Sequence, residues 1–324
     1  MTPDLPASLR AAIDKALEGV PRKGLAERAA RASRAYRAGQ PSSAVIVEAD
    51  DALAYALTRL PATYAACAAV LAEAARRAPD FAPASLLDAG AGTGAASWAA
   101  VDAWPRLAAL TWLDASSPFL ALARQLAAAG PQGLREAQAV RGDLTAAGPW
   151  PRADLVIASY ALAEIAADRQ TSTIIELWTS CDGLLVLVEP GTPAGYRRIL
   201  AAREILFDIG ATVIAPCPHQ AACPLVGEDW CHMSVRLPRS RDHRLAKGAE
   251  VPFEDERYSY LIAARPGVAL GPARPRILAP PRTGKPGIAL KLCGVDGALE
   301  SRLVAKRDKV AYAAIRRLGW GDVL

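Results

Sequence analysis

Two stretches of the first 78 residues carry apolar positions at helical spacing. Apolar side chains recur every three or four positions at Leu9, Ile13 and Leu17, and again at Leu53, Leu57 and Leu60. Such spacing predicts amphipathic helices, and the Pro-Ser-Ser sequence at 41–43 predicts a break between them. We expect residues 1–78 to form a helical N-terminal region that covers one edge of a following sheet and contributes no chemistry of its own.

The pattern changes after Ala84, where short apolar runs alternate with amphipathic stretches. The runs occupy residues 85–88, 110–114, 153–158 and 184–189, and helical stretches occupy residues 95–104 and 118–129. Strands that alternate with helices predict a parallel, doubly wound α/β sheet, which binds ligands outside the carboxyl ends of its strands. We assign residues 79–270 to this domain, with an insertion at about 212–234, and residues 271–324 to a C-terminal segment.

A glycine-rich sequence follows the first predicted strand and precedes a predicted helix. It reads Asp88-Ala-Gly90-Ala-Gly92-Thr-Gly94, and glycines allow the backbone to turn sharply and approach a ligand. The third glycine of a dinucleotide-binding Gly-x-Gly-x-x-Gly loop would fall at Ala95, and the Lys-Ser/Thr end of a P-loop is absent. The sequence resembles motif I of the Rossmann-like class I methyltransferases. The resemblance implies that the loop holds the methionine portion of S-adenosylmethionine.

Two further carboxylates follow in the order expected for such a site. Asp114 ends the second predicted strand, twenty residues after Gly94. A carboxylate there accepts hydrogen bonds from both ribose hydroxyls and repels the additional phosphate of NADP. The sequence Arg141-Gly-Asp143-Leu resembles the methyltransferase element that contacts the adenine amine. We therefore expect S-adenosylmethionine rather than NAD as the cofactor, bound by Asp88, the three glycines, Asp114 and Asp143.

The residues that meet the transferred methyl group are less well defined. The loop after residues 153–158 contains Ser159 and Tyr160, in place of the Asn/Asp-Pro-Pro-Tyr/Phe sequence that orients a nitrogen atom in many amino-group methyltransferases. We expect Ser159 to line the cofactor pocket. Methyl transfer depends mainly on alignment of the nucleophile with the methyl group, so we assign no catalytic residue.

Four cysteines form a pattern typical of a metal site. Cys217, Cys223 and Cys231 are clustered among prolines and histidines, and Cys293 follows at a distance. Four thiolates suit zinc or an iron–sulfur cluster. Paired Cys-x-x-Cys sequences, which zinc ribbons use, are absent, and this favours a 4Fe–4S cluster. Two nearby histidines keep zinc as the alternative.

The sequence gives weaker support for any other role of the cysteines. Cys67 and Cys181 lie in apolar runs and are expected to be inert core thiols. The pair Pro216-Cys217 resembles the nucleophile of cytosine-carbon methyltransferases, but that cysteine belongs in the loop near Ser159, and Cys217 comes after a later strand. We therefore reject a cysteine nucleophile.

The charge distribution and the composition predict what the protein binds and where in the cell it lies. The 324 residues have a net charge of +5, yet residues 272–324 carry eleven Lys and Arg against four Asp and Glu, which predicts contacts with phosphates. No stretch reaches the roughly 20 uncharged apolar residues of a membrane helix. The first 23 residues contain three acidic residues and do not resemble a targeting peptide. We expect a cytoplasmic protein with no membrane and no DNA partner.

Beyond the single motifs, the chain resembles the methyltransferase-like proteins of the mitochondrial small ribosomal subunit (the Rsm-twenty-two type) and their bacterial relatives. The resemblance is carried by residues 87–94 and 188–195, the cysteine block at 217–232, and residues 236–240, 253–260, 306–309 and 319–322. It extends from the late N-terminal helices to the C-terminus. The cysteine block is its most specific part.

This resemblance implies an association with the small ribosomal subunit or its rRNA, and a 4Fe–4S cluster held by Cys217, Cys223, Cys231 and Cys293. It implies an S-adenosylmethionine-dependent rRNA methyltransferase, with a non-catalytic assembly factor that binds S-adenosylmethionine and RNA as the alternative. A small-molecule methyltransferase is a further alternative, which gives the basic segment no role. The cluster would tie the insertion to the C-terminal segment, and strands at 235–237 and 258–263, which lie between Cys231 and Cys293 in the sequence, would complete the sheet. It would thereby order five basic side chains against RNA phosphates: Arg274, Arg276, Arg282, Lys285 and Lys291.

Overall fold

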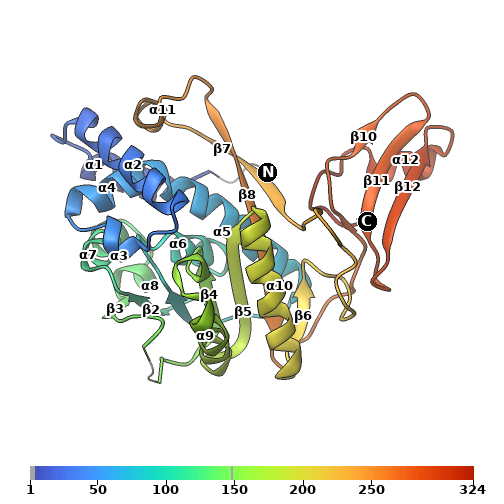
Figure 1. Ribbon diagram of the computed structural model, residues 1–324, viewed down its shortest axis with the longest axis horizontal. Coiled ribbons are helices and arrows are strands. Elements are labelled where there is room, and N and C mark those ends of the chain that lie inside the picture. The colour runs from blue at the N-terminus through green and yellow to red at the C-terminus, as the bar shows by residue number, and fades with distance from the viewer. Residues whose placement is uncertain (1–3, 147–148) are drawn as a thin grey trace.

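The N-terminal region is helical in the computed structural model, which describes residues 4–146 and 149–324, so that residues 1–3 of the predicted region lie outside the description. Its helices are α1 (Ala7–Ala16), α2 (Arg22–Arg37), α3 (Ser42–Val45), α4 (Ala49–Thr58) and α5 (Leu60–Arg77). The predicted break at 41–43 overlaps the start of the short helix α3, and the observed gap between α2 and α3 covers residues 38–41. In Figure 1 this blue region lies over one end and one face of the central sheet.

The central sheet has the strand order β3-β2-β1-β4-β5-β8-β6, and β7 pairs with β8 beyond this path. Its strands are β1 (Ser85–Ala89), β2 (Ala109–Asp114), β3 (Gln138–Arg141), β4 (Ala153–Ser159), β5 (Cys181–Pro190), β6 (Thr212–Ala215), β7 (Met233–Pro238) and β8 (Phe253–Ala264). Strands β3, β2, β1, β4 and β5 pair in parallel, and β8 runs antiparallel to both β5 and β6. This is the Rossmann-like sheet of class I methyltransferases, and the predicted fold class is confirmed.

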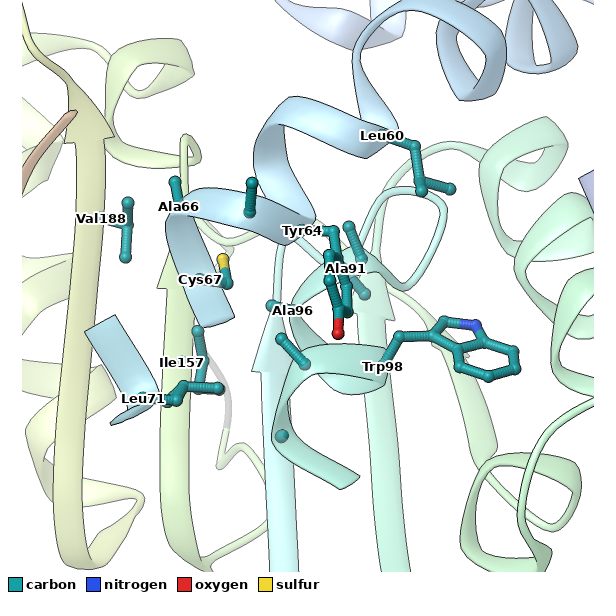
Figure 2. Packing of buried hydrophobic residues seen from close by; sticks show 14 of the residues in the cluster. Leu60, Tyr64, Ala66, Cys67, Leu71, Ala91, Ala96, Trp98, Ile157 and Val188 are labelled. Atoms are coloured by element: carbon teal, nitrogen blue, oxygen red, sulfur yellow. The ribbon is translucent and has the colours of Figure 1, made fainter. Parts of the chain in front are cut away.

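The strands are apolar on both faces because helices cover both sides. Neighbouring residues of one strand enter different cores: Leu86 packs into the cluster that contains the N-terminal helices, and Leu87 packs into the opposite cluster. The covering helices are α6 (Ala95–Ala103), α7 (Ser117–Ala127), α8 (Gln132–Arg135), α9 (Ala167–Thr179) and α10 (Pro193–Asp208). Such alternation into two cores explains why these strands read as continuous apolar runs. Figure 2 shows the first core, where Cys67 of α5 lies close to Leu71 and Ile157.

The C-terminal segment folds into a second, smaller sheet with its own core, which the sequence analysis did not predict. Its strands are β9 (Arg276–Ile277), β10 (Arg282–Thr283), β11 (Gly287–Cys293) and β12 (Leu299–Ala305), followed by α12 (Lys309–Ile315). Ile277, Ile288, Leu290, Leu292 and Ile315 form the core of this sheet. Figure 1 shows this red unit beside the edge of the central sheet.

Arg276 joins the small sheet to the rest of the protein. Its side chain is only 4% exposed, forms an ion pair with Glu73 of α5, and donates to the carbonyl oxygens of Pro216 (2.9 Å) and Gly321 (2.8 Å). The prediction that Arg276 contacts RNA phosphates is therefore wrong. A count of basic residues along the sequence does not distinguish a buried guanidinium from an exposed one.

Helix α11 (Arg241–Lys247) connects β7 to β8 and packs on α2, where Arg22 forms an ion pair with Asp242 at 2.7 Å. This contact fixes the N-terminal helices over the carboxyl ends of the strands. Within residues 4–146 and 149–324, no helix is both long and apolar enough to cross a membrane.

Candidate cofactor and metal-binding sites

The glycine loop lies at the carboxyl end of β1 and is closely packed. Gly90 has a φ of 74°, and a Cβ atom there would lie 2.8 Å from the Cβ of Ala161. Its backbone N–H donates to the carbonyl oxygen of Leu113 at 2.7 Å. Only glycine meets both conditions without strain, so the loop backbone is held against β2 and the loop after β4.

Asp114 connects the glycine loop to the next helix. Its carboxylate accepts hydrogen bonds from the N–H groups of Gly92 (2.8 Å) and Ser116 (2.7 Å). Ser116 in turn caps α7, accepting from the N–H of Phe119 at 3.3 Å. Burial raises the pKa of the Asp114 carboxyl above its ordinary value. The carboxylate still borders the cavity described next, where its remaining lone pairs are available to a ligand.

A cavity of about 1290 Å³ opens at the carboxyl ends of the parallel strands. Five of the sequence-predicted cofactor residues line it: Gly90, Gly92, Asp114, Asp143 and Ser159. Asp88 and Gly94 are not among its lining residues. The volume exceeds the about 300–1000 Å³ of an ordinary ligand pocket, so the cavity has room for a cofactor and an acceptor group together.

Asp88 lies beneath the loop. It is fully buried, and its Oδ2 accepts from the backbone N–H (3.1 Å) and the hydroxyl (2.7 Å) of Ser97. Its Oδ1 has no partner in the structure, and burial raises the pKa of the carboxyl to about 6. From this position Asp88 holds the start of α6 through Ser97, and its predicted contact with the cofactor stays a prediction.

Residues of the N-terminal helices form the opposite wall, although the sequence analysis assigned them no chemistry. Tyr36 of α2, Tyr55 of α4, and Arg59, which lies between α4 and α5, line the cavity. The ring of Tyr55 stands edge-on to that of Phe119, with centroids 4.9 Å apart. These positions gain meaning only once the helices are folded over the sheet, so no local sequence signal identifies them.

Tyr160 occupies the loop after β4, where the transferred methyl group is expected. It is a non-glycine residue with positive φ (59°) in the described chain, a conformation that costs about 1–3 kcal/mol and is often found at functional sites. Its hydroxyl donates to Glu256 at 2.9 Å, and Arg59 pairs with the same carboxylate at 3.1 Å. The strained backbone and the two contacts fix the Tyr160 ring in the cavity wall.

Glu189, which is buried, and Arg198, which is partly exposed, form an ion pair beside the cavity. Glu189 ends the buried part of β5, is fully buried, and accepts from Nε of Arg198 at 2.6 Å. Desolvation raises the pKa of Glu189 to about 7, while the charge of Arg198 acts in the opposite direction. Arg198 lies on α10 and lines the cavity.

The four cysteines that the sequence pattern grouped line a second, smaller cavity of about 40 Å³. Three of them come from the loop between β6 and β7, and Cys293 comes from the end of β11. The hydroxyl of Tyr196 lies 3.2 Å from Sγ of Cys223, and Nε2 of His219 lies 3.3 Å from Sγ of Cys293. Among the described residues, no three His, Cys, Asp or Glu side chains are placed to hold a single metal ion.

Buried arginine charge lies at and near this cysteine cavity: Arg203 is among its lining residues, and Arg276 is not. Arg203 is 3% exposed and lines the cavity, and its Nε has no partner in the structure. Burial raises the pKa of the thiols, to about 12 for Cys293, while the charges of Arg203 and Arg276 lower it. Nδ1 of the buried His219 is also without a partner. An anionic occupant would satisfy the buried positive charge.

The amino-acid sequence of the chain is similar to those of two mitochondrial proteins. The chain is similar to the human "Ribosome assembly protein METTL17, mitochondrial", with 27% identity over 84% of this chain and 62% of the human protein. It is also similar to "Rsm22-cox11 tandem protein 2, mitochondrial" of Schizosaccharomyces pombe, with 27% identity over 52% of this chain and 28% of that protein. The chain thus spans less than two thirds of either relative.

Solved structures show a more distant likeness. Magnesium protoporphyrin IX methyltransferase of Synechocystis, with bound S-adenosylmethionine, is 18% identical, covers 67% of this chain and 83% of its own, and has a TM-score of 0.41. The N-methyltransferase NodS of Bradyrhizobium japonicum is 14% identical, covers 60% and 84%, and has a TM-score of 0.40. The strand order described above, and not these likenesses, defines the fold class.

The family comparison also corrects the predicted compartment. The prediction of a cytoplasmic protein is wrong, because the matching family is described as mitochondrial and both relatives are mitochondrial proteins. The charge pattern of the first residues was not a sound basis for that prediction. The family described as "Mitochondrial small ribosomal subunit Rsm22" matches residues 49–324, and the chain belongs to this family.

Proposed function

We propose that the protein binds S-adenosylmethionine at the glycine loop and acts with the small ribosomal subunit, on its rRNA. The observation that carries the proposal is the convergence of Gly90, Gly92, Asp114 and Asp143 on one large cavity at the carboxyl ends of the strands. Parallel α/β sheets bind their ligands at this edge. Asp114 would accept from the ribose hydroxyls, and Asp143 would accept from the adenine amine.

The cofactor supplies an electrophilic methyl group, and the protein has to align an acceptor with it. Tyr160 is fixed in the wall on the acceptor side by Glu256 and Arg59. Ser159 borders the same space. These side chains orient an acceptor and exclude water; none is placed as a general base.

Exposed positive charge on the small C-terminal sheet supports an RNA partner. The exposed basic side chains of this segment are Arg274, Arg282, Lys285, Arg302, Lys306, Arg307, Lys309, Arg316 and Arg317. Such residues bind phosphates without regard to sequence and give a salt-dependent affinity. Lys291, which was also predicted to contact RNA, forms an ion pair with Asp229.

We also propose that the four cysteines hold a 4Fe–4S cluster, with zinc as the alternative. The four thiols line one cavity together with the buried Arg203, whose positive charge partly offsets the effect of burial on the pKa of Cys217 and Cys293. One Zn²⁺ would draw four sulfur atoms to about 2.3 Å from a single point. Paired Cys-x-x-Cys sequences, which zinc ribbons use, are absent from the chain, and this favours the cluster. Anaerobic purification with iron, sulfide and zinc analysis tests this proposal, and colourless protein with one zinc per chain would contradict it.

Methyl transfer is tested with radiolabelled S-adenosylmethionine and small-subunit RNA. The wild type should label the RNA, and Asp114→Ala should not. A second function, assembly without catalysis, is favoured by the printed name of the human relative and by the absence of an Asn/Asp-Pro-Pro-Tyr/Phe sequence at Ser159. Assembly of the small subunit that survives Asp114→Ala, without any labelled RNA, would support this second function.

A further inference from the structure

The cofactor cavity and the cysteine cavity share one helix. Ala194 and Arg198 of α10 line the cofactor cavity, whereas Tyr196 and Arg203 of the same helix line the cysteine cavity. Residues spaced two positions apart on a helix point to different sides, so the first turns of α10 separate the two sites. A small displacement of this helix changes both walls at once.

The turn that starts α10 has no room to move independently. A Cβ atom on Gly195 would lie 1.9 Å from the carbonyl oxygen of Pro190, and one on Gly191 would lie 2.6 Å from the backbone of Arg257. Thr192 caps the helix, its side chain accepting from the N–H of Gly195 at 3.1 Å. Closely packed backbone of this kind transmits displacement instead of absorbing it.

The cysteine loop holds this turn directly. Trp230 precedes Cys231, and its indole N–H donates to the carbonyl oxygen of Gly191 at 3.1 Å. Pro190 and Thr192, on either side of Gly191, line the cofactor cavity. A group bound by Cys231 would therefore also hold its neighbour Trp230, and through the hydrogen bond from Trp230 it would hold Gly191, between these two residues of the cofactor wall.

Strand β8 provides a second connection. Ser259 donates its hydroxyl to the carbonyl oxygen of Cys231 at 2.8 Å, and Tyr260 lines the cysteine cavity. Glu256, three residues before Ser259 on the same strand, holds Tyr160 and Arg59 in the cofactor wall. The first connection thus reaches Pro190 and Thr192 of the cofactor wall, and the second reaches Tyr160 and Arg59.

We propose that occupancy of the cysteine cavity by an iron–sulfur cluster controls ligand binding in the cofactor cavity, through the start of α10 and strand β8. The inference rests on the proposed function of both sites. Coupling between two sites is reciprocal for binding, so a cofactor ligand also tightens retention of the cluster. The protein would thereby bind its cofactor well only when iron is available.

The test uses full-length protein reconstituted with ferrous iron and sulfide, compared with metal-stripped protein. S-adenosylhomocysteine should bind the loaded protein at least about fivefold more tightly by calorimetry, the lower end of ordinary coupling factors. Loading should also slow hydrogen–deuterium exchange at the backbone amides of residues 191, 192 and 194–200. Trp230→Phe keeps an aromatic ring beside His232 but removes the N–H donor to Gly191, and should bring the affinity ratio toward one. Trp150→Phe is the matched control, because Trp150 lines neither cavity.

Equal affinities and unchanged exchange in protein shown to carry iron would overturn the coupling and leave both proposed sites intact. Slowed exchange in protein that binds no S-adenosylhomocysteine would support the connection and remove the cofactor assignment. Protein that takes up no iron would remove the metal centre and the coupling with it.

Discussion

Replacing Arg276 by methionine should lower the free energy of unfolding by about 3–5 kcal/mol, the usual cost of breaking a buried ion pair. The guanidinium is 4% exposed and contacts Glu73, Pro216 and Gly321. Its two hydrogen bonds to carbonyl oxygens, at about 1.5–3 kcal/mol each for charged donors, independently give a similar range. In this variant Glu73 still pairs with Arg76 at 2.6 Å, so its charge is not left unpaired and the loss of stability stays within this range.

Urea unfolding followed by tryptophan fluorescence measures the change. Arg282→Met is the matched control, because Arg282 is exposed on β10, and exposed substitutions usually change stability by less than about 0.5 kcal/mol. RNA binding should show the reverse order. Arg282→Met should weaken the affinity for RNA more than Arg276→Met does. If Arg276→Met is as stable as Arg282→Met, Arg276 does not hold the small sheet to α5 and the reasoning is refuted.

Two further predictions concern the glycine loop. Gly90→Ala should weaken S-adenosylhomocysteine binding at least about tenfold, or about 1.4 kcal/mol, because the added Cβ would press on Ala161. Gly210→Ala is the control, because Gly210 also has a positive φ but lies in open space. The affinity measured by calorimetry should be unchanged in this control. Asp88 has a pKa of about 6 in the folded protein against an ordinary 3.8, so its stabilising contribution is complete below about pH 4 and is lost as pH rises through 6. Two pKa units correspond to about 3 kcal/mol, and urea unfolding at pH 4 and pH 8 should show this dependence in the wild type and not in Asp88→Asn. Parallel pH profiles for the two proteins would show that Asp88 is not the group responsible.

The sequence was sufficient for the elements whose signal is local. The apolar runs predicted strands close to their observed bounds, because each strand is buried on both faces. The glycine sequence predicted the loop between β1 and α6, because left-handed backbone at Gly90 and neighbouring positions demands glycine. The short, largely exposed strand β3 and the small C-terminal sheet were missed, since neither has a long apolar run.

Contacts between distant residues were beyond the sequence. Tyr160 and Glu256 are 96 positions apart, and nothing near either residue indicates the other. The wall formed by Tyr55 and Arg59 depends on how α4 lies over the sheet. Burial of Arg276 likewise follows from its position between α5 and the cysteine loop and not from its neighbours in sequence.

The most direct test of the account is a calorimetric titration of the protein with S-adenosylmethionine. We expect one site per chain, lost in Asp114→Ala and kept in Asp182→Ala, because Asp114 borders the cavity whereas Asp182 pairs with Arg152 elsewhere. Failure of the wild type to bind, or binding that Asp114→Ala leaves unchanged, would contradict the assignment of the cofactor site.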